Sequence, residues 1–206
     1  MAMNRFPITN VEGDLVAQYR DPDEKLYASL ELNQVAFPKT GMVVSQTPLG
    51  DAFTKAAPCE NGMWVVGDKA AGAINPPEAA TDAPIGIVYT TEKEYDMMHY
   101  GLQRFGRKVK GDYPRVGLFG VGDTVTTNCL QYNTSNFADF DALETALKAI
   151  DTTPLYVVPG VAAEGSAKAV PEIVKTPPQA GIYGKIVKFY TIPNGGIGVK
   201  YQIIRV

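Results

Sequence analysis

The chain has 206 residues, of which 45% are apolar and 20% charged, as is ordinary for a globular protein with one sizeable core. Its 19 basic and 22 acidic residues give a net charge of −3. Nucleic-acid-binding proteins usually carry a basic surplus, so this balance argues against DNA or RNA as the main partner. We expect no membrane partner and folding in a cytoplasm, because the N-terminus lacks a signal-like apolar core and no stretch approaches the roughly 18 apolar residues that span a bilayer.

Residues 1–40 carry apolar side chains, among them Phe6 and Tyr19, that follow neither the period of a strand nor that of a helix. Such a segment is poorly suited to burying its own apolar residues. We therefore predict an extended N-terminal arm over 1–40 that needs a partner surface. Within it, Asp21 could cap a short helix that ends near Leu32.

Residues 41–206 are predicted to form one β-rich domain, because β-branched and aromatic runs alternate with Gly, Pro and Asn. Small-residue loops are expected over 70–83 and 159–178, and a bend or bulge at Gly117, Gly120 and Gly122. The predicted strands in this part of the chain cover 41–47, 62–66, 85–91, 115–119, 123–130 and 155–158.

One helix is predicted over about 137–150, where four apolar residues share a face: Phe140, Leu143, Leu147 and Ile150. Asn136 or Asp139 could cap it, and Glu144 and Lys148 form a favourable i,i+4 pair. We expect this helix to pack over a sheet. The predicted fold class is therefore mainly β, a sandwich or a barrel, with one packed α-helix and the N-terminal arm.

The last predicted element is a hairpin over about 182–206. Its strands, 182–192 and 197–206, are long, β-branched and aromatic. They flank Asn194-Gly195, a pair that tolerates the positive φ angles of a hairpin turn.

Catalytic and metal-binding patterns are largely missing from the sequence. His99 is the only histidine, which excludes a two-histidine zinc motif, and its neighbours form no nucleophile motif. Three nearby acids, Glu92, Glu94 and Asp96, fit a solvated face better than an acid–base pair. The two cysteines, Cys59 and Cys129, are predicted to be reduced thiols. We expect no enzyme, no cofactor and no metal site.

A basic stretch over 104–115 contrasts with the acidic chain, since it holds five basic residues and one acid, a local charge of +4. It could be a solvated loop, a site that docks onto an acidic protein lattice, or a nucleic-acid site in which Phe105 and Tyr113 stack on bases. Among functional roles, a protein partner is favoured. The basic residues are Arg104, Arg107, Lys108, Lys110 and Arg115.

The passage from Gly101 to Asn128, GLQRF followed by GDYPRVGLFGVGDTVTTN at 111–128, resembles a passage in structural proteins of tailed-bacteriophage virions, particularly head decoration (cement) proteins. The resemblance implies a non-enzymatic protein of the phage head, made in the host cytoplasm, that binds the major capsid protein lattice and stabilises it. A homo-oligomer is a further expected association.

The predicted partner interface comprises the basic residues of 104–115 together with Phe6 and Tyr19 from the arm. Two alternatives stay open. One is a neck, tail or baseplate component of a virion. The other is a carbohydrate- or small-molecule-binding β module that uses Trp64 and several tyrosines as a platform.

Overall fold

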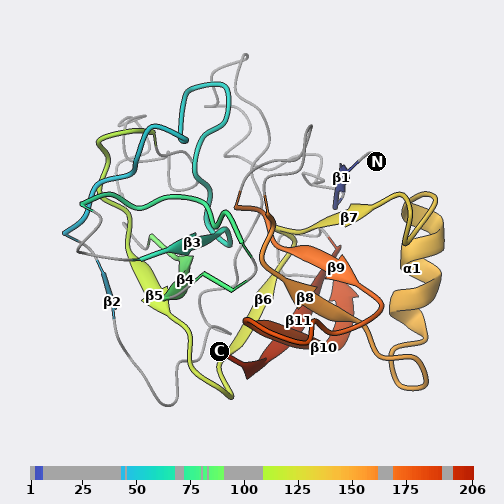
Figure 1. Ribbon diagram of the computed structural model, residues 1–206. Coiled ribbons are helices and arrows are strands. Elements are labelled where there is room, and N and C mark those ends of the chain that lie inside the picture. The colour runs from blue at the N-terminus through green and yellow to red at the C-terminus, as the bar shows by residue number, and fades with distance from the viewer. Residues whose placement is uncertain are drawn as a thin grey trace.

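The fold is mainly β, in agreement with the sequence-based prediction. The computed structural model describes residues 3–6, 43–44, 46–67, 72–79, 81–82, 84–90, 109–161, 169–191 and 197–206. These residues form two sheets and one helix. Figure 1 shows the smaller sheet with its loops on one side of the molecule, and the larger sheet with the helix on the other.

The larger sheet has seven strands in the order β1-β7-β9-β8-β10-β11-β6. Neighbouring strands are antiparallel except β7 and β9, which are parallel. The strands are β1 (Met3–Arg5), β6 (Thr124–Thr127), β7 (Gln131–Asn133), β8 (Tyr156–Val158), β9 (Glu172–Val174), β10 (Tyr183–Thr191) and β11 (Ile197–Arg205).

This sheet must be strongly curled. Strands β6 and β7 lie five positions apart in the sheet order, which in a flat sheet would be roughly 24 Å. Only residues 128–130 connect them, and the four steps from Thr127 to Gln131 span at most about 14 Å of extended chain. The edge strand β6 therefore approaches β7, the strand next to the opposite edge, and the sheet resembles an incomplete barrel.

The smaller sheet has the order β2-β5-β4-β3 and is antiparallel throughout. Trp64 pairs with Ile87 on the face that joins the core of the large sheet, whereas Val88 pairs with Val116 on the opposite face. That second face packs against Leu49 and other apolar residues of the loops. Strands β3, β4 and β5 are largely buried on both faces, which explains why they read as apolar runs, whereas Val43 on the edge strand β2 is exposed. The strands are β2 (Val43–Val44), β3 (Trp64–Val66), β4 (Ile85–Val88) and β5 (Val116–Leu118).

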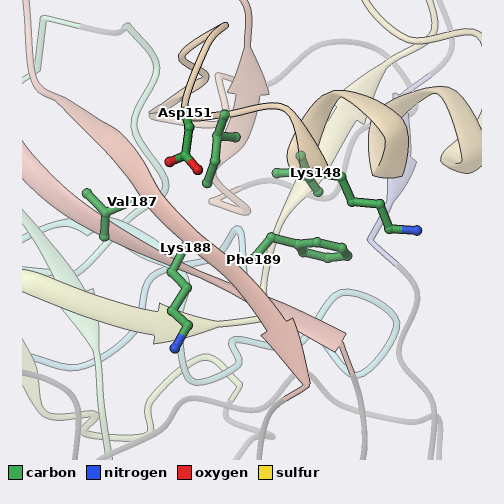
Figure 2. A pocket seen from close by; sticks show the side chains of 7 residues that line it. Lys148, Asp151, Val187, Lys188 and Phe189 are labelled. Carbon is green, nitrogen blue, oxygen red and sulfur yellow. The ribbon is translucent and has the colours of Figure 1, made fainter.

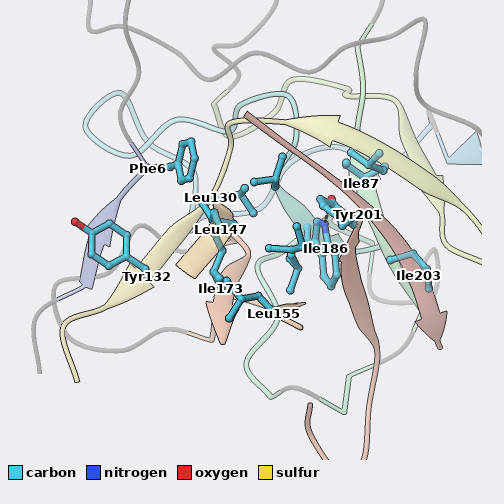
Figure 3. Close-up of a cluster of buried hydrophobic side chains, with 14 of the residues drawn as sticks. Phe6, Ile87, Leu130, Tyr132, Leu147, Leu155, Ile173, Ile186, Tyr201 and Ile203 are labelled. Atoms are coloured by element: carbon cyan, nitrogen blue, oxygen red, sulfur yellow. Dashed lines mark hydrogen bonds between the residues drawn. The ribbon is translucent and has the colours of Figure 1, made fainter. Parts of the chain in front are cut away.

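Trp64 and Tyr201 connect the two sheets through the main core. The indole Nε1 of Trp64 donates a hydrogen bond of 2.8 Å to the hydroxyl oxygen of Tyr201 on β11. The Trp64 ring also meets Phe119, with 5.0 Å between ring centroids. Both bonded side chains are completely buried, and burial raises the pKa of Tyr201. Figure 3 shows the surrounding apolar cluster, which holds the two sheets together.

The predicted helix is present as α1, Phe140–Lys148, somewhat shorter than 137–150. Asp139 caps it, because its Oδ1 accepts a 2.8 Å hydrogen bond from the backbone N–H of Ala142. The predicted Glu144–Lys148 pair forms an ion pair of 3.0 Å. Leu143 and Leu147 are buried in the main core, so α1 packs on the sheet as predicted.

Replacement of the α1 cap gives a first test. Asp139→Ala should lower the free energy of unfolding by about 1 kcal/mol, because an N–H of the first turn loses its acceptor. Asp139→Asn keeps an oxygen at the same position and should cost much less. Urea unfolding followed by circular dichroism measures both, and equal costs for the two variants would contradict the capping role.

The structure of residues 3–6 contradicts two of the predictions. Strand β1 pairs with β7, so Met3–Arg5 belongs to the sheet and not to a free arm. Phe6 is 1% exposed, with its ring 5.2 Å from that of Phe140, and its N–H donates a 2.8 Å hydrogen bond to the carbonyl of Leu130. Its predicted role in a partner interface is therefore wrong, because the core already occupies this side chain. The rest of the predicted arm, Tyr19 and the short helix included, lies outside the described residues.

Candidate functional site

The described part of the predicted basic interface is a turn fixed to the segment 49–53. Gly111 occupies it with φ at +88°, a backbone conformation that glycine adopts readily. The carbonyl of Asp112 accepts from the N–H of Leu49 at 2.9 Å, and the N–H of Lys110 donates to the carbonyl of Phe53 at 2.8 Å. These bonds hold Lys110 and its neighbours in place on the small-sheet side of the protein.

Acidic groups balance the positive charge of this part. Lys110 forms an ion pair with Asp51, and both side chains are largely exposed. The Asp112 carboxylate accepts a 2.8 Å hydrogen bond from the N–H of Val109. Arg115 is exposed, and Tyr113 is 57% exposed. The structure brings Lys110, Tyr113 and Arg115 to one stretch of surface. The carboxylates of Asp51 and Asp112 lie in the same region, so the positive charges of Lys110 and Arg115 are balanced there.

The remaining predicted interface residues, Arg104, Arg107, Lys108 and Tyr19, lie outside the described residues. The same holds for the candidate catalytic residues His99, Glu92, Glu94 and Asp96. Their roles stay predictions.

Residues 116–127 join the two sheets through β5, a tight turn and β6. The turn runs from Gly120 to Asp123, with Gly122 at φ +98°. The N–H of Gly120 donates to Asp123 Oδ2 at 2.7 Å, and the N–H of Gly122 donates to the carbonyl of Ile203 on β11 at 2.8 Å. Gly120 and Gly122 form the predicted bend, whereas the prediction is wrong for Gly117, which lies within β5 and pairs with Ile87. This part of the Gly101–Asn128 passage therefore has a clear structural role in connecting the sheets.

Two carboxyls, the buried Asp123 and the half-buried Glu172, make stability depend on pH. Burial raises the pKa of Asp123, against the opposing hydrogen bond from Gly120, and burial also raises the pKa of Glu172 on β9. In each case the folded protein binds the proton more tightly than the unfolded chain does. Stability should therefore fall as pH rises from the ordinary carboxyl range, near 4, through the raised values.

Glu172→Gln tests this dependence, since it removes one of the two ionisations. We expect the free energy of unfolding to decline less steeply above pH 4.5 in this variant than in the wild type, because 4.5 is the ordinary pKa of the glutamate carboxyl. Urea titrations at several pH values measure the slope. Glu78→Gln, at an exposed position, controls for loss of a negative charge, and an unchanged slope in Glu172→Gln would contradict the assignment.

Both cysteines are buried thiols that form no disulfide, as predicted. Burial raises the pKa of Cys129 to about 12. Because the thiolate is the reactive form, neither Cys59 nor Cys129 should react readily in the native protein. A thiol-reactive chromogenic disulfide should titrate two thiols only after denaturation. Rapid reaction of either thiol under native conditions would contradict the burial.

A pocket of about 290 Å³ lies between the end of α1 and strand β10 (Figure 2). Lys148 and Lys188 bring positive charge to its lining and Asp151 a negative charge, but Lys148 is already paired with Glu144. The apolar lining residues of the pocket are Leu147, Ile150, Val187 and Phe189.

Within the described ranges, no group of three or more His, Cys, Asp or Glu side chains could hold a metal ion. Nor is any helix there long and apolar enough to cross a membrane. Trp64 is 0% exposed, so the suggestion that it forms part of a sugar-binding platform is wrong. Comparisons of the chain with protein-family models, curated proteins and solved structures gave no match.

Proposed function

We propose that this chain is a non-enzymatic structural protein of a phage virion that binds the major capsid protein lattice and stabilises the head. The observation that carries the proposal is the resemblance of Gly101–Asn128 to a passage of head decoration proteins. The described part of this passage, residues 109–128, includes the strands and the turn that join the two sheets. The resemblance therefore supports a scaffold shared with head decoration proteins. The contacts with the capsid lattice are a further step of the proposal.

The scaffold has properties that suit such a role. The large sheet is curled, strands β3, β4 and β5 of the small sheet are largely buried on both faces, and one apolar cluster spans both sheets. Close packing of this kind resists deformation. On a lattice, a rigid body that makes several weak contacts binds more tightly than each contact alone would allow, since every contact raises the effective concentration for the next.

Co-sedimentation with heads assembled from the major capsid protein tests the proposal. Purified chain should bind such heads in a saturable manner and raise the temperature at which they come apart, because a ligand stabilises the state that it binds. Unassembled capsid protein serves as the control for lattice dependence. Failure to bind heads would contradict the proposed function, and binding to tails or baseplates instead would assign the chain to another part of the virion.

A further inference from the structure

The C-terminal part of the chain is strongly basic. Residues 173–206 contain four lysines and one arginine but neither Asp nor Glu, so in a chain of net charge −3 the first 172 residues carry −8. Three of these lysines, Lys185, Lys188 and Lys200, lie on the adjacent strands β10 and β11. The hairpin therefore concentrates positive charge in one region of an acidic protein.

Strand register places the three lysines on the same outer face of the sheet. Lys188 pairs directly with Lys200, and Lys185 pairs with Gln202. Between these pairs, Ile186 and Tyr201 are buried in the core, 1% and 0% exposed, and side chains alternate between faces along a strand. The lysines therefore point away from the core.

A β-bulge brings Lys188 to this face. The register shifts between Ile186 and Lys188, so Val187 has no partner on β11. With regular alternation after Ile186, Lys188 would point into the core. The extra residue Val187 shifts the inward–outward alternation of side chains by one position, so both Val187 and Lys188 are exposed. Figure 2 shows Lys188 and Phe189 leaving β10 in different directions.

This arrangement sets two like charges directly opposite each other, which destabilises a sheet. Among the described residues, no ion pair joins Lys185, Lys188 or Lys200 to an acid. The Nζ of Lys188 lies 5.0 Å from the centre of the Tyr190 ring. An anionic partner would relieve the repulsion.

The neighbouring aromatic and arginine side chains favour protein carboxylates over nucleic acid. Base stacking requires a free ring face, but Lys188 lies over Tyr190 and Arg205 lies over Tyr183. The guanidinium of Arg205 donates to three backbone carbonyls at 2.7 to 3.0 Å, so three of its five N–H donors are already engaged and it is poorly placed for bidentate binding of a phosphate. Among the described residues, the ammonium groups of Lys185, Lys188 and Lys200 have no acidic partner and carry the positive charge of this face.

We propose that the outer face of β10 and β11 marked by Lys185, Lys188 and Lys200, the lysine face, docks onto a carboxylate-rich surface of a partner protein. That this partner is the capsid protein rests on the function proposed above. The docking chemistry itself does not require it.

Fluorescence polarisation of the full chain with a labelled oligoglutamate peptide tests the docking chemistry. The wild type should bind the peptide, and the double variant Lys188→Gln/Lys200→Gln should bind at least about tenfold more weakly, a loss typical of a few charged contacts. The matched control is Lys55→Gln/Lys110→Gln, which removes two exposed lysines from the loops on the small-sheet side and should change affinity less than about twofold. Equal losses in both double variants, or no binding by the wild type, would overturn the proposal.

A labelled oligothymidylate of the same charge is the second probe. Tighter binding of this probe than of the peptide, lost in the lysine-face variant, would assign the face to nucleic acid and overturn the proposal. Neither assay contains virions. These two assays therefore test the lysine face alone. The proposed capsid function is tested separately by binding to heads and by the composition of particles.

Stability supplies a readout that a structural lysine would not give. Lys200→Gln removes the repulsion opposite Lys188 and leaves the Lys188–Tyr190 contact in place, so the urea midpoint should rise while peptide affinity falls. A lower midpoint would show that Lys200 stabilises the sheet, which would contradict a face that is strained until a partner binds.

Discussion

Trp64→Ala is expected to lower the free energy of unfolding by about 3–5 kcal/mol, the usual cost of removing a large buried aromatic side chain. The indole is 0% exposed, lies between the two sheets and contacts Phe119 and Tyr201. The substitution also leaves the buried Tyr201 hydroxyl without its donor. Urea unfolding followed by far-ultraviolet circular dichroism measures the loss.

Two control variants separate the causes of this loss. Trp64→Phe keeps much of the apolar volume and removes the N–H donor, so it should cost clearly less than Trp64→Ala. Tyr113→Ala truncates an aromatic side chain that is 57% exposed and should change stability by no more than about 0.5 kcal/mol. A Trp64→Ala variant as stable as Tyr113→Ala would contradict the shared core of the two sheets.

Phe6→Ala is expected to cost about 3–5 kcal/mol as well, because the Phe6 ring is 1% exposed and contacts Phe140 of α1. Phe6→Leu, which keeps an apolar side chain of moderate size, should recover part of the loss. The same unfolding measurement applies. A small change in the free energy of unfolding of Phe6→Ala would contradict the burial of Phe6 and would support the original prediction that it belongs to a free arm.

This result changes how a truncation should be designed. Removal of residues 1–40 would take away β1 and Phe6 together, so it should destabilise the domain. Loss of capsid binding after that deletion would not identify an arm. Changes confined to positions after Phe6 are the appropriate test of the predicted arm.

Local sequence signals were sufficient for much of the fold. The predicted hairpin over 182–206 corresponds to β10 and β11, since long β-branched and aromatic runs are strong strand signals. The helix was found because its apolar period, its cap Asp139 and its Glu144–Lys148 pair are all local features. The turn residues 192–196 between the two strands lie outside the described residues.

Features that depend on distant neighbours could not be predicted in this way. Strands β7 and β9 are three residues each and were missed, because their paired residues lie 41 positions apart and the strands form through this parallel pairing and the adjacent strands. Gly160 lies in the loop that the sequence predicts over 159–178. Its real constraint is distant, since a Cβ there would lie 1.7 Å from the carbonyl oxygen of Val170.

The functional surfaces could likewise not be predicted from local sequence signals. Trp64 is the only tryptophan, and composition alone could not tell a buried ring from an exposed platform. The lysine face was missed because its lysines are 15 positions apart at the extremes and meet only through the register of β10 and β11 and the bulge at Val187. The signal available in the sequence was the absence of acidic residues after Glu172.

The most direct test of the proposed function is the copy number of this chain in particles. Quantitative mass spectrometry of purified virions from its source should give a ratio to the most abundant structural protein near one, or a simple lattice fraction of it, if the chain decorates the head. A dozen copies or fewer would instead place it in a neck or tail. Absence of the chain from the particles would contradict the virion function altogether.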